Sequence, residues 1–339
     1  MLQHRISHFW LALKTFFGFA EAETEHNAPA NPSHRETSTH THDELIARFG
    51  DSIAPVNVGG LFGEVVGQIT STMLDGPGVA LDSGNTFSGL IEIRAASLVG
   101  DSHVESGTRR QDAYAVHIDR DVGSIHIAVC DGVGSRSRSN EGAALVATTV
   151  AREAAIRSPN PVGAARLRLT RMAEAAGVPA IEYSTTLIWV DVDVGQPGDV
   201  WEARLLQYGD GDVRLLSQTE ALWRSVSRST HVDEADALSF SLPLGSHPRR
   251  EHVFSWHPGE ALVVATDGLA YHLDSQTKVG YYLANSWCRP PGRWDFLSDV
   301  AFRTLGAGDD RTAVALWRTD VRTMTEQHAQ VFANKKRRT

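Results

Sequence analysis

Five aspartates stand at the ends of apolar runs between positions 112 and 309. Asp131 and Asp267 each follow such a run and each precede a glycine. An apolar run of this length is typical of a buried strand, and the Asp-Gly pair is typical of the turn that ends it. Asp210 lies between two further runs, whereas Asp112 and Asp309 stand shortly before one. A single Asp-Gly pair indicates only a turn, but five acids at strand ends favour one composite site.

Carboxylates crowded at one rim of a sheet require a cation or a proton. Two unit charges about 4 Å apart repel by roughly 4 kcal/mol at an effective dielectric constant near 20, so such a cluster binds cations or raises its pKa values. No histidine or cysteine set at ligand spacing accompanies the acids, and oxygen ligands favour Mg²⁺ or Mn²⁺ over zinc. One ion could be structural. Two ions about 4 Å apart would activate a water and hold a phosphoryl group, and they would reverse the charge that repels a phosphate ester.

The apolar runs predict strands that come in pairs, with helices between and after them. We expect strands over 91–98, 113–119, 124–130, 184–190, 202–208, 212–216, 251–256, 261–266 and 312–318. We expect helices after Ser139 or Asn140, over 161–176 with a stop at Gly177, around 276–286, and near 296–305. This order predicts an α+β domain in which antiparallel sheets carry helices on their outer faces. Residues 219–242 would form a flap over one end of the sheets.

Composition limits the remaining classes of function. The chain has 339 residues, a hydrophobic content of 42% and a net charge of −9. An acidic balance argues against general nucleic-acid binding, which needs a basic surface, and no apolar stretch reaches the length of a transmembrane helix. Two cysteines, Cys130 and Cys288, provide no disulfide framework and fit a reducing cytoplasm.

The pattern of apolar and polar residues divides the chain into five segments. Residues 1–20 predict an amphipathic helix, because apolar residues recur at helical spacing from 2 to 17; this stripe could pack within the molecule, dock on a partner or lie on a membrane surface. Residues 21–43 are polar and predict a disordered linker. Residues 44–90 form a poorly defined extension, 91–318 the candidate catalytic domain, and 319–339 a tail.

The ordered motifs resemble those of the protein phosphatase 2C family of metal-dependent serine/threonine phosphatases. The motifs are Asp131-Gly132-Val133-Gly134, Ser184-Thr185-Thr186-Leu187, Gly209-Asp210-Gly211-Asp212, Ala265-Thr266-Asp267-Gly268-Leu269 and Asp309-Asp310-Arg311-Thr312. The resemblance spans about residues 91–318, and the segment 100–113 is similar to a bacterial branch of the family. It implies a four-layer α-β-β-α sandwich of two antiparallel sheets flanked by helices.

The resemblance also implies a metal role for four positions. Asp131 would bridge two Mn²⁺ or Mg²⁺ ions, and the carbonyl of Gly132 would bind one of them. Asp267 and Asp309 would hold the other ion. Asp310, next to Asp309, would be a neighbour of the site rather than a ligand.

Two further acids have secondary roles by the same resemblance. Asp112 would orient metal-bound waters, and Asp210 matches an acid that helps to bind a third, weaker metal in some members. Gln111 stands where members often have an acid, which leaves one carboxylate fewer for the metal waters.

The groups that handle the phosphate depart from the animal enzymes. Val133 replaces a histidine that acts as general acid there, and Gly107 falls where those enzymes have a phosphate-binding arginine. Arg109, Arg110 or His103 could substitute. Arginine is the better bidentate phosphate ligand, whereas His103 matches the branch pattern; each could also be only a structural loop residue.

The leading hypothesis is therefore a phosphatase that hydrolyses phosphoserine or phosphothreonine with a water activated by two metals. A catalytically weak or inactive signalling module that keeps the fold is the main alternative, motivated by Gln111, Val133 and Gly107. A two-metal phosphoesterase acting on a small phosphate or nucleotide is a third. The family analogy implies a phosphorylated protein substrate and a serine/threonine kinase as opposing partner.

Overall fold

A computed structural model describes residues 67–70, 78–226, 240–302 and 308–319. By backbone contacts the chain divides into Met1–Val58 and Gly59–Thr339, and every described residue belongs to the second unit. The expected helix over 1–20, the linker over 21–43 and residues 320–339 of the tail lie outside the described residues. Among those described, no helix is both long and apolar enough to cross a membrane.

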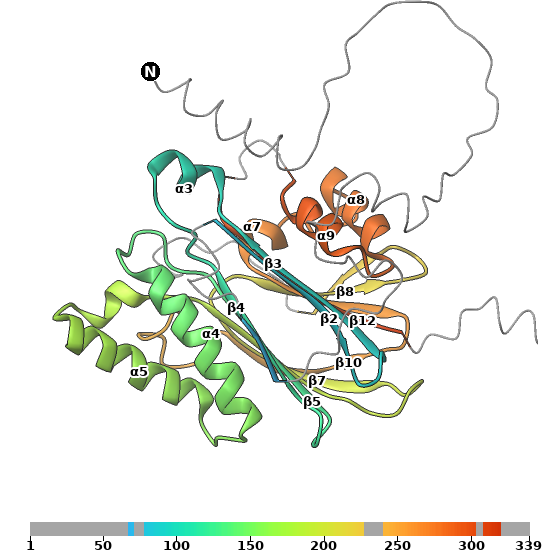
Figure 1. Ribbon diagram of the computed structural model, residues 1–339, viewed down its shortest axis with the longest axis horizontal. Coiled ribbons are helices and arrows are strands. Elements are labelled where there is room, and N and C mark those ends of the chain that lie inside the picture. The colour runs from blue at the N-terminus through green and yellow to red at the C-terminus, as the bar shows by residue number, and fades with distance from the viewer. Residues whose placement is uncertain (1–66, 71–77, 227–239, 303–307, 320–339) are drawn as a thin grey trace, which may run out of the picture. The chain divides into compact units, whose positions relative to one another are not determined.

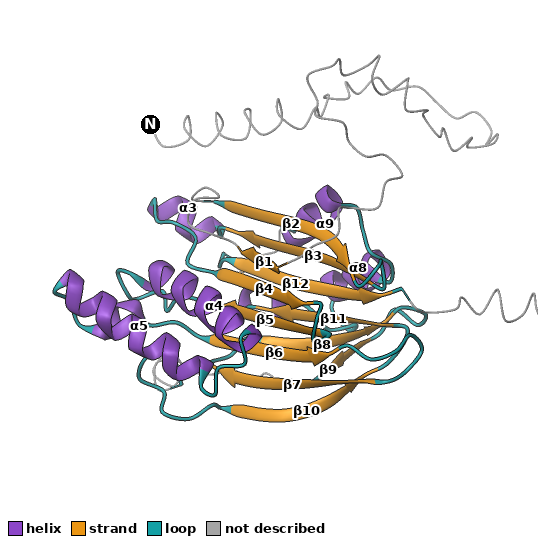
Figure 2. Ribbon diagram, turned by 60° about the horizontal axis from the view of Figure 1, so that its bottom comes forward, coloured by secondary structure: helices purple, strands orange, loops and turns teal. Residues whose placement is uncertain are grey.

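Twelve strands form two antiparallel six-stranded sheets within the described part of the chain. The first sheet has the order β1 (Gly67–Thr70), β4 (Ala113–Asp119), β5 (Ser124–Cys130), β6 (Leu187–Asp193), β7 (Trp201–Tyr208), β10 (Arg250–Trp256). The second has the order β2 (Val79–Thr86), β3 (Ile91–Leu98), β12 (Arg311–Arg318), β11 (Glu260–Ala265), β8 (Asp212–Ser217), β9 (Trp223–Ser225). Figure 2 shows the strands as two stacks that face each other.

Helices cover the outer face of each sheet (Figure 1). On the first sheet lie α4 (Ser139–Ala155) and α5 (Pro161–Ala176), followed by the short 3₁₀ helix η2 (Ala180–Tyr183). On the second lie α7 (Asp267–Ala270), α8 (Lys278–Trp287) and α9 (Arg293–Val300). One short helix, α3 (Asp101–Ser106), precedes β4. The predicted α-β-β-α sandwich is confirmed.

Side chains alternate along each strand between the core inside the sandwich and the core beneath the helices. In β5, Ile125, Ile127 and Val129 pack into the core between the sheets, while Ala128 and Cys130 belong to the cluster beneath α4 and α5. Side chains of alternate residues point to opposite faces of a strand, so one strand serves both cores. The small residues on its outer face let the helix approach closely.

The structure differs from the sequence-based expectation in several places. Strands β1 and β2 lie within residues 44–90 and form edges of both sheets, so the sandwich begins before residue 91. The segment 100–107, for which the sequence predicts no helix, contains α3. Helix α4 begins at Ser139, and Arg138 precedes it without a side-chain cap. Within the expected flap, β9 pairs with β8, and residues 227–239 are outside the described residues.

We predict that Gly142→Ala destabilises the fold. Alanine favours a helix by about 1 kcal/mol over glycine, but a Cβ at position 142 of α4 would overlap the carbonyl oxygen of Tyr183. Overpacking of a rigid backbone contact costs about 1–3 kcal/mol, so the midpoint of thermal unfolding should fall. Leu167→Ala, at an exposed position of α5, is the control and should change the midpoint little. An unchanged or raised midpoint for Gly142→Ala would show that α4 can move away from η2.

Candidate metal centre

Asp131 follows the fully buried strand β5, and neutral groups hold its backbone. Its amide donates to Thr186 Oγ1 at 2.9 Å, and its carbonyl accepts from Thr185 Oγ1 at 2.8 Å and from the amide of Thr186 at 2.7 Å. Gly132 continues the turn beside Ser139, at the start of α4. The Thr185 and Thr186 hydroxyls therefore fix the position of the Asp131 backbone without supplying positive charge.

Asp267 reaches the same rim from the second sheet. It is the first residue of α7, directly after β11 and Thr266. The amide of Thr266 donates to the carbonyl of Thr312, and Thr266 Oγ1 accepts from the amide of Thr312 at 3.0 Å. A Cβ at Gly268 would overlap the carbonyl oxygen of Asp310. The Asp-Gly pair here therefore reflects close backbone packing as well as a turn.

Asp210 lies in the connection between β7 and β8. Gly209 has a φ of 96°, which favours glycine, and a Cβ there would also meet the side chain of Thr186. This close contact brings the turn beside the motif that holds Asp131. Glycine at 209 therefore lets Asp210 lie next to Asp131, although the two are far apart along the chain.

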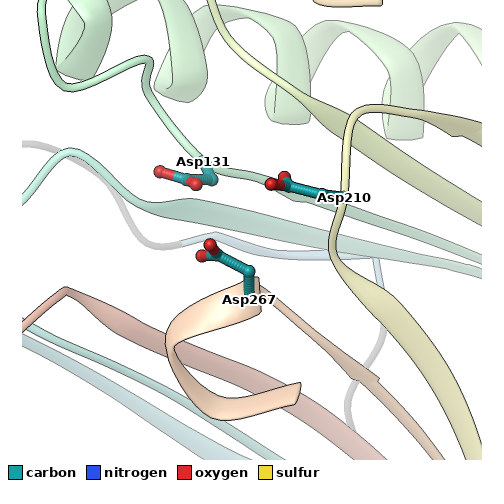
Figure 3. Close-up of side chains that lie close together, drawn as sticks. All are labelled: Asp131, Asp210 and Asp267. Carbon is teal, nitrogen blue, oxygen red and sulfur yellow. The ribbon is translucent and has the colours of Figure 1, made fainter. Parts of the chain in front are cut away.

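The three carboxylates meet in space, as Figure 3 shows. One oxygen each from Asp131, Asp210 and Asp267 lies within 4.8 Å of the others, and all three residues are half-buried. Burial, followed by the charges of Asp210 and Asp309, raises the pKa of Asp267 to about 7. Burial raises the pKa of Asp131 well above its usual range, and the neighbouring acids add to the shift. Each carboxyl therefore favours a proton or a cation over a bare charge.

Asp112 lies beneath this group. It is 4% exposed, and its Oδ2 accepts from Thr266 Oγ1 at 2.8 Å. Its Oδ1 is buried without a hydrogen-bond partner among the described residues. Burial and the charge of Asp310 raise the pKa of the Asp112 carboxyl. Since buried polar atoms are normally paired, the unpaired oxygen fits a group that a metal site would bring, such as an ordered water.

Asp309 and Asp310 differ in their surroundings. Asp309 is exposed, lies outside the group of three, and contributes its charge to Asp131 and Asp267. Asp310 is buried, and its carboxylate accepts from the amides of Gly100 and Gln111 and pairs with His103 Nδ1 at 2.8 Å. The sequence analysis did not predict that Asp310 would hold His103 and the backbone of Gly100 and Gln111. The adjacent acids at 309 and 310 were a signal that one of them is structural.

Arg110 occupies a different environment. It is 7% exposed, and its guanidinium donates to the carbonyl of Ser97 in β3 at 3.1 Å. Val133, which stands where the animal enzymes have their histidine, is also buried. His103 is half-buried on α3 and is held by a carboxylate of the Asp309-Asp310 motif. Of the residues considered for handling phosphate, His103 is thus linked directly to the acidic rim.

The residues fit a hard divalent cation. Carboxylate oxygens are the preferred ligands of Mg²⁺ and Mn²⁺, and Asp131, Asp210 and Asp267 offer three within a short distance. The charges of four other aspartates, Asp112, Asp267, Asp309 and Asp210, all raise the pKa of Asp131. A cation would relieve this repulsion.

We predict that Mn²⁺ stabilises the protein, and that it does so more at pH 8 than at pH 5. A carboxyl whose pKa is raised in the fold contributes stability below its unfolded pKa and loses it as the pH rises through the folded value, here about 7 for Asp267. The metal-free protein should therefore melt at a lower temperature at pH 8, and Mn²⁺ should restore the loss. Scanning calorimetry with Mn²⁺ and with EDTA measures both effects.

The matched control is Asp267→Asn. It removes one of the repelling charges and should reduce the difference between the metal-free and metal-loaded melting temperatures at pH 8. Equal melting temperatures for the natural sequence with Mn²⁺ and with EDTA would contradict a metal centre at this rim.

No curated protein matches the sequence. Solved structures with a similar fold include PppA, a key regulatory component of T6SS in Pseudomonas aeruginosa, at 20% identity, with 67% of this chain and 97% of that chain covered and a TM-score of 0.45. The S. agalactiae serine/threonine phosphatase shows 17% identity over 67% and 99% of the two chains, with a TM-score of 0.45. The catalytic domain of PstP, in complex with two manganese ions, shows 12% identity over 74% and 98%, with a TM-score of 0.41.

The family described as Protein phosphatase 2C matches residues 99–293, more than half of the chain. The match includes Asp112, Asp131, Asp210 and Asp267 and ends before Asp309. The chain belongs to the protein phosphatase 2C family.

Proposed function

We propose that the protein hydrolyses phosphoserine or phosphothreonine in proteins with the help of two Mn²⁺ or Mg²⁺ ions. The convergence of Asp131, Asp210 and Asp267 from separate parts of both sheets is the observation that carries the proposal. Bound divalent ions supply an activated water and neutralise the charge on a phosphoryl group. A domain that only binds partners has no physical need for mutually repelling acids at one rim, which argues against the inactive-module alternative.

Each aspartate has a proposed role that follows from its position in the site. Asp131, with the carbonyl of Gly132, holds the centre of the site from the first sheet, and Asp267 and Asp309 hold it from the second. Asp210 is placed to bind a third ion or to share one. Asp112, buried beneath them with one unpaired oxygen, positions water in the site.

His103 is the candidate for protonating the leaving oxygen. Asp310 pairs with Nδ1 of its ring, which fixes the ring orientation and leaves Nε2 for a substrate oxygen. Arg110 stays a prediction for phosphate binding; one nitrogen of its guanidinium, Nη1, donates to the Ser97 carbonyl. A phosphorylated protein substrate, an opposing serine/threonine kinase and a cytoplasmic location complete the proposal.

We predict that Asp131→Asn and Asp267→Asn each reduce Mn²⁺-dependent release of phosphate from a phosphothreonine peptide by about 100-fold or more, as for mutations that disable a metal site. Each change removes a ligand charge and conserves the size of the side chain. Asp121→Asn, at an exposed position of the β4–β5 turn, is the control and should keep full activity.

Calorimetric titration with Mn²⁺ separates loss of metal from loss of fold in these variants. Full activity of either metal-site variant, or of the natural sequence in EDTA, would contradict the proposed reaction. A substrate set with nucleotides and sugar phosphates distinguishes it from an enzyme for small phosphates, which would prefer those substrates to the phosphopeptide.

We predict that His103→Gln slows hydrolysis of phenyl phosphate much more than hydrolysis of p-nitrophenyl phosphate. A general acid contributes about 100-fold or more when the leaving oxygen needs a proton, and p-nitrophenolate leaves readily without one. Comparison of kcat for the two esters measures the difference. His257→Gln, at an exposed position after β10, is the control. Equal losses on both esters would show that His103 binds phosphate or supports the fold and does not donate the proton.

A further inference from the structure

A cavity lies on the outer face of the first sheet, away from the acidic rim. Helix α4 covers β4, β5 and part of β6, and the strands continue beyond its end (Figures 1 and 2). The cavity has a volume of about 450 Å³. Its lining residues are Val122, Ser124, His126, Arg157, Asp191, Asp193, Glu202, Arg204 and Val253.

Three of these residues form a hydrogen-bonded chain. Ser124 Oγ lies 3.1 Å from His126 Nε2, and His126 Nδ1 lies 2.7 Å from Asp191 Oδ1. Ser124 and His126 are 6% and 8% exposed, and both line the cavity. A hydroxyl, an imidazole and a carboxylate in this order and at these distances are the parts of a serine nucleophile with its base and the residue that orients the base.

The strand register explains how the three residues meet. Ser124 and His126 alternate with Ile125 and Ile127, which face the inter-sheet core, so both point to the outer face. His126 stands directly opposite Asp191 in the neighbouring strand β6. The chain of hydrogen bonds is therefore built on two paired strands, which hold a site more firmly than loops do.

A fourth residue fixes the carboxylate. Trp189 Nε1 donates to the same Asp191 oxygen at 2.6 Å. An ionised Asp191 accepts from both donors, so His126 carries its proton on Nδ1 and presents Nε2 as an acceptor to the Ser124 hydroxyl. This is the tautomer that a general base requires.

The cavity lining carries two arginines, Arg157 and Arg204, beside the acids Asp191, Asp193 and Glu202. Arg204 faces Asp191 across the β6–β7 pair and forms an ion pair with Glu251 at 3.8 Å. Arg157, just beyond the end of α4, has a φ of 55°, a left-handed conformation that is uncommon for a residue with a side chain. Among the described residues, Arg157 takes part in no ion pair. The strand amides around Ser124 are used in the sheet, so a guanidinium is the available donor for a developing oxyanion.

We propose that this cavity is a second, metal-independent active site in which Ser124 attacks small carboxylic esters. Ser124 Oγ bonds to the acyl carbon while its proton passes to His126 Nε2, and collapse of the adduct breaks the ester C–O bond. His126 returns the proton to the departing alcohol. Water then attacks the acyl-serine through the same base, which releases the carboxylic acid and restores the hydroxyl.

This site is distinct from the metal centre. Ser124 begins β5 and Asp131 follows its last residue, so seven strand steps of about 3.3 Å separate them by about 23 Å. The proposal does not depend on the phosphatase function, and the two can fail independently.

The esterase and labelling assays use the full-length protein in the presence of EDTA. The natural sequence should hydrolyse p-nitrophenyl acetate and react with a fluorophosphonate probe, whose fluoride is displaced by Ser124 Oγ. Mass spectrometry of the labelled protein should locate the probe on Ser124. Ser124→Ala should lose labelling, and Ser124→Ala and His126→Gln should each lower the esterase rate by roughly 100-fold.

Three controls make the result specific. Ser255→Ala, at an exposed serine of the same sheet, should leave labelling and rate unchanged. Ser124→Ala should keep the Mn²⁺-dependent phosphatase activity, which shows that the variant is folded. Asp191→Asn should lower kcat with little change in KM, and Asp191→Glu should recover part of the loss, since Asp191 acts by positioning His126.

Labelling of a different residue would overturn the proposal. So would an esterase rate in Ser124→Ala equal to that of the natural sequence, because the three residues would then form only a structural hydrogen-bond chain on the sheet.

Discussion

Buried and half-buried aspartates repel one another at the candidate metal centre, and the surrounding residues must hold them in place against this repulsion. Asp131 and Asp210 come from strand ends of the first sheet, and Asp267 and Asp309 come from the second. Burial and the charges of neighbouring acids raise the pKa values of Asp131 and Asp267, so the fold holds these carboxyls together at an energetic cost. The groups that position them are the hydroxyls and amides of neutral residues. The unneutralised charge is what makes this rim suited to divalent ions and, through them, to phosphate.

Thr266 and Asp310 connect the segments that carry the acidic rim. Thr266 links Asp112, on the first sheet, to β12 of the second through its hydroxyl. Asp310 accepts from Gly100 and Gln111 and pairs with His103. The distances within the acidic group therefore depend on hydrogen bonds that cross between the sheets, and the position of His103 depends on the same network.

Much of the layered fold could be predicted from the sequence, because each strand of the core carries its own apolar run. The bounds expected for the strands over 91–98, 113–119 and 124–130 and for the helix over 161–176 match β3, β4, β5 and α5. The acids were found because Asp-Gly pairs after such runs are local patterns. The five acids at strand ends already favoured one composite site, whereas the role of each aspartate needed the family resemblance, since it depends on which strand ends meet.

Features that depend on long-range contacts were missed. Strand β2 contains Asp82, Ser83 and Gly84, so its apolar pattern is weak, and only pairing with β3 shows that it is a strand. Helix α3 has no buried residue, so it has no amphipathic stripe to find. A helix pair separates Ser124 and His126 from Asp191 in the sequence, and only the register of β5 with β6 brings Asp191 beside His126.

The location of the acids on both sheets also links the metal centre to the assembly of the sandwich. Neither sheet alone presents the complete set of carboxylates, because Asp131 belongs to one and Asp267 to the other. An ion bound by carboxylates of both sheets would cross-link the two sheets at this rim. The complete set of carboxylates exists only when the two sheets lie against each other, so metal occupancy would report that the sandwich is assembled.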